Sequence, residues 1–215
     1  MYIFQLERYL LQKQVKKFGH YIRGSVLDLG SGELDRYGKW FNCEKYTKMD
    51  IFENPNVDVV GSADSIPFPD SNFDSVIATQ VFEHVPYPEK SASEVFRVLK
   101  PGGYFLMTVP QTNELHEEPH DYWRYTKFGI KELFERHGLY SVEIDQRGGF
   151  FVMIGQIQMR YLIDRFHLHS HRFLGRVCSK IFHLVGNIMI WLDSVDTSTA
   201  NRKHAIGWCA VFKKS

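Results

Sequence analysis

Residues 25–32, Ser-Val-Leu-Asp-Leu-Gly-Ser-Gly, decide the fold class of this chain. They form a short apolar run that ends in a glycine-rich turn, which is typical of a buried strand entering a loop. Further strand-like runs follow at 46–50, 56–60, 73–79, 103–110, 139–145 and 206–212. Helical patterns lie between several of them, at 33–41, 88–100 and 127–137. Strands that alternate with helices predict an α/β protein with a Rossmann-like parallel sheet and helices on both faces.

The chain on either side of this core has helical patterns of its own. Residues 2–18 are amphipathic, with Ile3, Leu6 and Leu10 on one stripe, and the stretch of about 150–193 is apolar and basic. We therefore expect a single domain in which the last strand is a late antiparallel edge strand. Its parts are an N-terminal helix (1–24), a ligand-binding core (25–147), a helical insert (148–200) and the last strand (201–215).

Composition excludes several classes of protein. Of 215 residues, 44% are hydrophobic and 24% charged, which excludes a disordered tail, a fibre or a disulfide miniprotein. The net charge of +1 gives no overall signature of nucleic-acid binding. The charge is uneven, however: residues 151–215 hold nine Lys and Arg against three Asp and Glu, a net of +6, and the rest carries −5.

The cysteines and the N-terminus bear on the compartment. Cys43, Cys178 and Cys209 lie far apart with no Cys-x-x-Cys pair, so we expect no zinc ribbon or disulfide framework and a reducing, cytoplasmic environment. The N-terminal residues mix charged and apolar types, unlike a signal peptide. Because no run of about 18 uncharged apolar residues occurs, we expect no membrane-spanning segment.

The glycine turn points to a nucleoside ligand, because open parallel sheets bind ligands beyond the carboxyl ends of their strands. Gly30 and Gly32 permit a tight turn and a close approach to the backbone. Asp28 ends a buried strand, where a carboxylate needs a cation or hydrogen-bond donors. Asp50 closes the next strand 20 residues after Gly30, the spacing at which a carboxylate accepts from ribose hydroxyls.

The residues after the turn disfavour a diphosphate. A dinucleotide turn carries a third glycine where this chain has Asp35, and Glu33 directly follows the second glycine. A carboxylate there would repel a pyrophosphate. The pattern therefore favours a nucleoside cofactor without phosphate over NAD.

Several motifs together resemble the class I S-adenosylmethionine-dependent methyltransferases. They are VLDLGSG (26–32), the strand end at Asp50, GSADSIPFPDSNFDSVIATQVFEHV (61–85) and RVLKPGGYFLMTVP (97–110). The closest resemblance is to the type 11 branch, typified by ubiquinone/menaquinone biosynthesis methyltransferases. It runs from about residue 25 to 145, and it departs from the commonest pattern in lacking a glycine at Leu34.

The resemblance implies a site for S-adenosylmethionine. The glycine turn would carry the methionyl part, Asp28 would face its ammonium and Asp50 would hold the ribose diol. Ala63 and Asp64 would read adenine, although Asp64 can also be a turn-forming residue. The cofactor-binding residues that we predict are Asp28, Gly30, Ser31, Gly32, Asp50, Ile51, Ala63, Asp64, Thr79, Gln80 and Val81.

Residues 111–126, QTNELHEEPHDYWRYT, form the predicted acceptor loop, and similar HDYWRYT stretches occur in methyltransferases found with bacterial surface-polysaccharide genes. His120 is the candidate general base. Tyr122, Arg124 and Tyr125 are the candidate substrate contacts. In the alternative, Trp123 and Tyr125 pack a lid, and Asp121 pairs with Arg124. For Glu83 and His84, which follow the fourth strand, we prefer a role as a helix-start pair that fixes its own loop by hydrogen bonds over a role of His84 as a base.

The motif HLHSH places His167, His169 and His171 two residues apart. On a helix His167 and His171 would share a face and could bind a metal, but no other metal-ligand pattern accompanies them. A solvated or lipid-facing turn is the preferred interpretation. We predict no metal in this protein.

The function that these patterns predict is methyl transfer from S-adenosylmethionine to a small molecule, such as a sugar or a lipid-linked glycan. The alternatives are a non-catalytic cofactor-binding or interaction module and a nicotinamide-dependent oxidoreductase. Nucleic acid is not expected as a partner, because no Asn/Asp-Pro-Pro-aromatic motif follows the fourth strand. Apolar residues at helical spacing over 173–192, with basic residues opposite, predict either a homodimer or core interface or a peripheral membrane contact.

Overall fold

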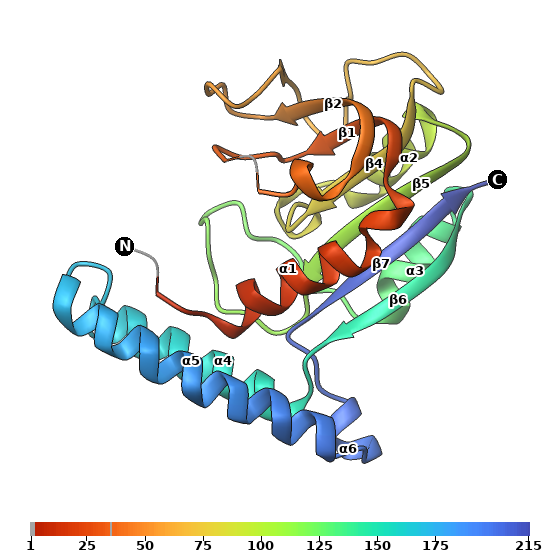
Figure 1. Cartoon of the computed structure of the whole chain (residues 1–215). Helices are drawn as coiled ribbons and strands as arrows, with labels where there is room; N and C mark the ends of the chain where they lie inside the picture. The colour runs from red at the N-terminus through yellow and green to blue at the C-terminus, as the bar shows by residue number, and fades with distance from the viewer. Residues whose placement is uncertain (1–2, 35) are drawn as a thin grey trace. The chain divides into compact units, whose positions relative to one another are not determined.

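The structure, a computed structural model, describes residues 3–34 and 36–215 and contains a seven-stranded sheet of order β3-β2-β1-β4-β5-β7-β6 (Figure 1). The strands are β1 (Arg23–Leu29), β2 (Asn42–Asp50), β3 (Val59–Val60), β4 (Phe73–Thr79), β5 (Leu99–Pro110), β6 (Leu139–Arg147) and β7 (Gly207–Lys214). The α-helices are α1 (Leu6–Phe18), α2 (Pro88–Val98), α3 (Lys127–Glu135), α4 (Phe150–Arg165), α5 (Arg172–Val195) and α6 (Thr199–Arg202). Short 3-10 helices are η1 (Gly19–Tyr21), η2 (Gly38–Trp40) and η3 (Phe82–His84).

The strand order of the sheet reverses at β1, because successive strands are added first on one side of β1 and then on the other. Strand β1 pairs in parallel with β2 on one side and with β4 on the other, β3 extends the first half and β5 the second. The arrow of β7 runs opposite to that of β5 in Figure 1, and β7 lies between β5 and β6, one position inside the edge. The predicted fold class, a mostly parallel Rossmann-like sheet with a late antiparallel strand, is confirmed, but the last strand is not the expected edge strand, because β6 lies outside it.

The central strands are apolar on both faces because both faces are covered. Val26, Leu27 and Leu29 in β1 and Val76 and Ile77 in β4 are completely buried. Helix α2 has Pro88 in its first turn, where a missing N–H is tolerated, and buries Ala92, Val95 and Val98. Helix α3 begins at a cap in which the Thr126 side chain accepts from the Gly129 N–H, and it ends before Gly138 at φ +84°.

The chain forms two compact units, which we describe separately. The sheet unit contains residues 14–110, 115–145 and 208–215. The helical unit contains the chain up to Lys13 together with residues 111–114 and 146–207. The expected single domain with its four parts stays a prediction. The last segment of the helical unit begins at Gln146, close to residue 148, where the predicted insert begins.

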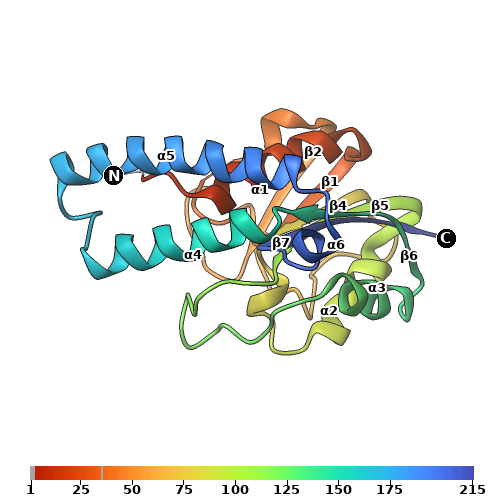
Figure 2. The same cartoon turned by 90° about the horizontal axis from the view of Figure 1, so that it is seen from below.

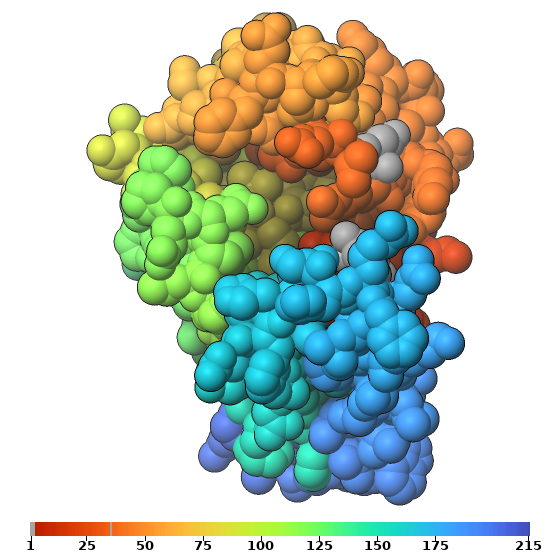
Figure 3. Space-filling view, turned by 90° about the vertical axis from the view of Figure 1, so that its left-hand side faces the viewer, coloured from red at the N-terminus to blue at the C-terminus, as the bar shows by residue number. Residues whose placement is uncertain are grey.

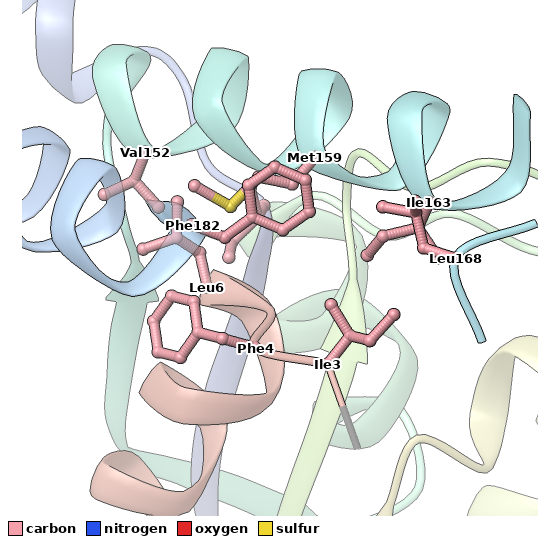
Figure 4. Packing of buried hydrophobic residues seen from close by; sticks show 9 residues of the cluster. Ile3, Phe4, Leu6, Val152, Met159, Ile163, Leu168 and Phe182 are labelled. Carbon is pink, nitrogen blue, oxygen red and sulfur yellow. The ribbon is translucent and has the colours of Figure 1, made fainter. Parts of the chain in front are cut away.

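The helical unit has its own apolar core (Figure 4). Ile3, Phe4 and Leu6 precede or begin α1 and pack against side chains of α4 and α5. The buried members of this cluster are Ile3, Phe4, Leu6, Val152, Met159, Ile163, Leu168, Phe182 and Ile206. Gly186 permits the close approach of α5, because a Cβ at this position would lie 2.7 Å from the Phe4 ring. The N-terminal residues thus complete the core of the helical unit.

The predicted helical stretch 150–193 is a hairpin of two helices, α4 and α5, which lie side by side in both views (Figures 1 and 2). Helix α4 ends at Arg165, and His167 has φ +46°, which breaks the helix. His167, His169 and His171 therefore lie in the connecting turn, and the premise that His167 and His171 share a helix face is wrong. The Asp193 carboxylate closes the hairpin at its other end, accepting from the backbone N–H groups of Gly149, Phe151 and Val152.

One further expectation needs correction, and another stays a prediction. In its described part, the predicted helix at 33–41 is only the short 3-10 helix η2. Its hydrogen bonds join residues three positions apart: Trp40 N–H donates to Tyr37 O (2.8 Å) and Phe41 N–H donates to Gly38 O (3.2 Å). Asp35, the residue at the third-glycine position, lies outside the described residues. The expectation of no membrane-spanning segment stays a prediction: α5 is long and apolar enough to cross a membrane by length and composition, and 17% of its most apolar window is buried.

Candidate functional site

The glycine turn lies at the reversal point of the sheet, where β1 meets β4. Gly30 has φ +67° and donates its N–H to Met49 O at 2.8 Å, so the turn is tied to the end of β2. A Cβ on Gly30 would lie 2.4 Å from Val81 Cγ2, just beyond β4. Only glycine meets both demands, because a side chain would be strained by its backbone angle and would collide with Val81.

Asp50 closes the turn from the neighbouring strand. Its Oδ2 accepts from the Gly32 N–H at 2.9 Å, and its Oδ1 accepts from the Phe52 N–H at 3.1 Å. Each carboxylate oxygen retains a second lone pair, which a ribose hydroxyl can use. Asp50 thus orders the glycine turn and also presents an acceptor at the carboxyl end of β2.

The turn has features that fit a ligand lying on its backbone. The Ser31 hydroxyl is buried and has no hydrogen-bond partner among the described residues. A Cβ on Gly32, which has φ +66°, would meet no described atom within 4 Å. Asp28 is 6% exposed and accepts from the Tyr46 hydroxyl at 2.7 Å, so its charge is held next to the turn. In the space-filling view a hollow lies between the orange residues that follow β1 and the green acceptor loop (Figure 3).

Three further predicted cofactor-binding residues, Ile51, Ala63 and Asp64, lie in two loops of the sheet unit. Ile51 follows Asp50 and is 56% exposed, which leaves an apolar surface for a base. Ala63 is buried, and Asp64 Oδ1 accepts from the Ser62 hydroxyl within a narrow turn in which Ser62 bridges Ser65. Asp64 therefore has the local turn contact of the alternative interpretation, and adenine recognition by Asp64 stays a prediction.

The residues after β4 take an unusual backbone path. Thr79 is the last residue of β4, and Gln80 has φ +57°. Gln80 donates its backbone N–H to Thr108 O at 2.9 Å and its side-chain amide to Thr108 Oγ1 at 3.2 Å. These two bonds to β5 stabilise the path that brings Val81 against Gly30.

The acceptor loop is held to η3 and to the residue after it, Val85, by four hydrogen bonds. The backbone N–H groups of Tyr122 and Trp123 donate to Glu83 O at 2.8 and 3.1 Å. The Trp123 indole donates to Val85 O at 2.9 Å, and the Tyr125 hydroxyl donates to Phe82 O at 3.0 Å. Residues some 40 positions apart along the chain are thereby held as one structure.

The predicted acceptor residues have different environments. His120 Nδ1 and the Tyr122 hydroxyl share a hydrogen bond of 3.1 Å, and Tyr122 is 45% exposed, so both can meet a ligand. The Arg124 guanidinium binds both oxygens of Asp121 and lowers the pKa of that carboxyl to about 2. Tyr125 is buried, and this burial raises the pKa of its phenol. This placement favours the packing role for Tyr125 and does not support its predicted substrate contact.

The structure also gathers residues that the sequence did not bring together. Ligand atoms of Glu83, His84 and His116 all lie within 4.8 Å of one another. His84 Nδ1 donates to His120 O at 2.7 Å, so this side chain also holds the acceptor loop. The adjacent Glu83-His84 pair and the acidic loop were visible in the sequence, but no spacing rule connects them with His116.

An open surface pocket lies elsewhere, over the start of α4 in the helical unit. Gly149, Asp193 and Asn201 are among the residues that line it, and the Asn201 side chain accepts from the Phe150 N–H at 2.7 Å. None of the predicted cofactor or acceptor residues lines this pocket. Its polar groups cap a helix, so it adds nothing to the candidate site.

Comparisons with known proteins bear on the sheet unit and on the fold. Residues 27–107 match the methyltransferase domain family of type 11. The chain is 29% identical over 165 residues to the ubiquinone/menaquinone biosynthesis C-methyltransferase of Salmonella arizonae, covering 67% of this chain and 60% of that protein. The chain therefore spans less than two thirds of the length of this curated relative.

Solved structures share the fold at low sequence identity. A putative methyltransferase from Bacillus halodurans aligns with a TM-score of 0.59 at 17% identity, over 95% of this chain and 98% of that one. Phosphoethanolamine N-methyltransferase 2 of Haemonchus contortus, in complex with S-adenosylmethionine, aligns with a TM-score of 0.58 at 18% identity, over 96% of this chain and 52% of that one. These similarities show the fold.

Proposed function

Residues 27–107 of this chain belong to a class I S-adenosylmethionine-dependent methyltransferase domain of type 11, and we propose that the chain transfers a methyl group from S-adenosylmethionine to a small-molecule acceptor. The observation that carries the proposal is the glycine turn, with the buried Ser31 hydroxyl, the open space at Gly32 and the Asp50 carboxylate in one place. The non-catalytic module and the nicotinamide-dependent oxidoreductase are not favoured.

The chain's own residues would bind and align the reactants. S-adenosylmethionine supplies an activated methyl group on sulfur, so the protein has chiefly to orient it. Asp28 would attract the ammonium, Asp50 would accept from the ribose hydroxyls, and the backbone at Gly30 and Gly32 would let the cofactor lie close. Such alignment can contribute about 7–11 kcal/mol to lowering the barrier. His120, beside Tyr122, would accept a proton from an oxygen or nitrogen acceptor.

Cofactor binding is the first test. Calorimetry with the purified full chain should detect S-adenosylhomocysteine and no NAD. Asp50→Ala should weaken this binding by about 1.5–3 kcal/mol for each lost ribose bond to the charged carboxylate. Tight binding of NAD together with no binding of S-adenosylhomocysteine would reject the proposal.

The acceptor loop is tested separately. His120→Ala and Tyr122→Phe should lower turnover and leave cofactor affinity nearly unchanged, because these groups meet the acceptor rather than the cofactor. The acceptor can be found by comparing metabolites of a deletion strain with those of its parent. If both variants methylate that acceptor normally, the loop serves only as a structural lid.

We further propose that the acceptor is lipid-linked and that the α4–α5 hairpin contacts the membrane surface. The outer side of α5 exposes a regular apolar stripe at intervals of three and four residues, which places them on one helix face. Its members, all at least 40% exposed, are Val177, Ile181, Leu184, Ile188, Trp191 and Val195. Exposed aromatic side chains Tyr161, Phe166 and Phe173 extend this surface around the turn.

Charge around the turn favours an anionic lipid surface. Residues 160–180 hold five Lys and Arg and one Asp, and Arg172, Arg176 and Lys180 are exposed on α5. Each basic residue near such a surface adds about 1 kcal/mol to binding. The Asp193 bonds to the start of α4 and the buried Phe182 tie α5 to its neighbour, which favours a hairpin lying in the headgroup layer over a helix crossing the bilayer.

Vesicle co-sedimentation tests this contact. The full chain should bind phosphatidylserine vesicles at low salt, bind phosphatidylcholine vesicles weakly, and lose the former when Arg176 and Lys180 are changed to Glu. No vesicle binding together with a stable dimer would make the stripe a homodimer interface. Retention in the membrane pellet after carbonate extraction of cells would indicate a spanning helix instead. The corresponding location that we propose is cytoplasmic and peripheral at the membrane.

A further inference from the structure

We propose that Glu83, His84 and His116 bind a divalent transition-metal ion, zinc by the chemistry of the three ligands. Their ligand atoms lie within 4.8 Å of one another, two on η3 and one on the acceptor loop. The Glu83 side chain is fully buried, and the His84 side chain is 16% exposed. Two imidazoles and a carboxylate are a ligand set that zinc uses, and the partial burial leaves access from one side.

The hydrogen bond of His84 fixes the ring in the form that binds metals. Its Nδ1 lies 2.7 Å from the His120 carbonyl oxygen, which can only accept, so Nδ1 carries the proton. The lone pair is therefore on Nε2. That atom lies 4.0 Å from Glu83 Oε1 and 3.7 Å from Glu117 Oε2, so it points toward the carboxylates. A backbone carbonyl that holds the outer nitrogen is a common support for a metal-binding histidine.

His116 has the corresponding support from a carboxylate. Its Nδ1 lies 3.3 Å from Asp121 Oδ2, and Asp121 is itself held on both oxygens by Arg124. The contact with Asp121 orients the His116 ring, as carboxylates commonly do for metal-binding histidines. The His84 and His116 rings meet edge to face with centroids 4.8 Å apart. Asp121 and Arg124 thus become positioning residues for His116, which gives this pair a purpose beyond closing the loop.

The ligands need only a small movement. Tetrahedral zinc at about 2.0–2.1 Å from each ligand atom places those atoms about 3.3 Å apart, so the cluster would tighten by about 1.5 Å at most. His116 lies on a loop that is anchored at Tyr122 and Trp123, which lets its outer part close on η3 while the anchor holds. Glu117, whose side chain is 74% exposed, lies within reach to approach from the open side.

Three protein ligands leave a fourth position for an outside oxygen, as in zinc sites that bind substrates. Val81, the last of the predicted cofactor-binding residues, lies two positions before Glu83. The open position would therefore take an oxygen of the acceptor, a part of the inference that rests on the proposed function. Metal binding itself does not depend on it.

The test measures metal binding by the untagged full chain after chelation and dialysis. Calorimetry should give one equivalent of Zn²⁺, and Co²⁺ should give the visible absorption of a tetrahedral complex. His84→Ala and His116→Ala should each weaken Zn²⁺ binding by more than about 100-fold, because loss of a ligand exceeds the effect of a supporting residue. Glu83→Gln, which preserves the side-chain volume, should do the same.

Two matched variants separate this site from general histidine affinity. His120→Ala retains the carbonyl that holds His84, and His137→Ala removes a histidine that pairs with Glu89 at 2.7 Å; both should bind Zn²⁺ normally. Asp121→Asn should weaken binding by about 10–100-fold. Less than 0.1 equivalent of bound metal, or unchanged binding by folded His84 and His116 variants, would overturn the inference. Cofactor affinity, measured on the same samples, reports separately on the proposed methyl transfer.

Discussion

The glycine turn of the sheet unit and the α4–α5 hairpin of the helical unit use apolar residues in opposite ways. Around the turn, the apolar residues of β1 and β4 are completely buried and the polar groups lie at the strand ends. On α5, Phe182 is buried, whereas its neighbour Ile181 and nearby Leu184 are 52% and 64% exposed. Burial stabilises a fold only where water is removed. The apolar residues of these strands therefore stabilise the fold, whereas those on the exposed face of α5 remain available to contact another surface.

The largest effect that we expect tests the inner side of α5. Phe182→Ala removes a ring from the core of the helical unit and should lower the free energy of unfolding by about 3–5 kcal/mol. Urea denaturation followed by circular dichroism measures this loss. A change below 1 kcal/mol would mean that α5 does not depend on that core.

The second prediction tests the glycine turn. Gly30→Ala adds a left-handed backbone cost of about 1–2 kcal/mol and a collision with Val81 worth about 1–3 kcal/mol, so stability should fall by about 2–5 kcal/mol. The Val81→Ala background removes the colliding methyl group. Measured in that background, Gly30→Ala should cost only the backbone part. An equal loss in both backgrounds would show that the contact with Val81 is unimportant.

The third prediction concerns pH and the loop that precedes β4. The hydrogen bonds from Arg97 lower the pKa of Glu94, which also accepts from the Ile66 N–H at 2.7 Å. Because the folded pKa lies below the unfolded value of about 4.3, this stabilisation is present above that pH and disappears as the pH falls through the folded pKa. Glu94→Gln should cost about 1 kcal/mol at pH 7.

A pH series checks the sign. The difference in unfolding free energy between the parent and Glu94→Gln should be constant from pH 5 to 8 and should shrink as the pH falls below about 4. A difference that grows in acid would contradict the assignment.

The smallest effect on stability is expected on the outer side of α5. Ile181→Ala and Leu184→Ala should each change the unfolding free energy by less than about 0.5 kcal/mol, because both side chains are already exposed. The pair should nevertheless reduce binding to phosphatidylserine vesicles. Losses similar to that of Phe182→Ala would place this face inside the fold and remove the contrast between the two sides of the helix.

The sequence alone determined the elements with strong local patterns. The strand before Gly30, the strand that ends at Asp50 and the run at 73–79 follow from consecutive apolar residues and the turns that bound them. The resemblance to methyltransferases rests on the same stretches. By contrast, the α-helix expected at 33–41 is only the 3-10 helix η2 in its described part, with hydrogen bonds between residues three positions apart.

Only the tertiary structure decided what the loops do. His84 and His116 are 32 residues apart, and they meet because the backbone of the acceptor loop donates to Glu83 O. The sequence left open whether Tyr125 contacts a substrate or packs inside the fold, and whether the apolar face at 173–192 is covered. A sequence pattern shows which residues are apolar but not which residues lie next to them. Periodicity is a property of adjacent residues. Contacts between distant loops depend on hydrogen bonds that form only when the sheet has placed their ends.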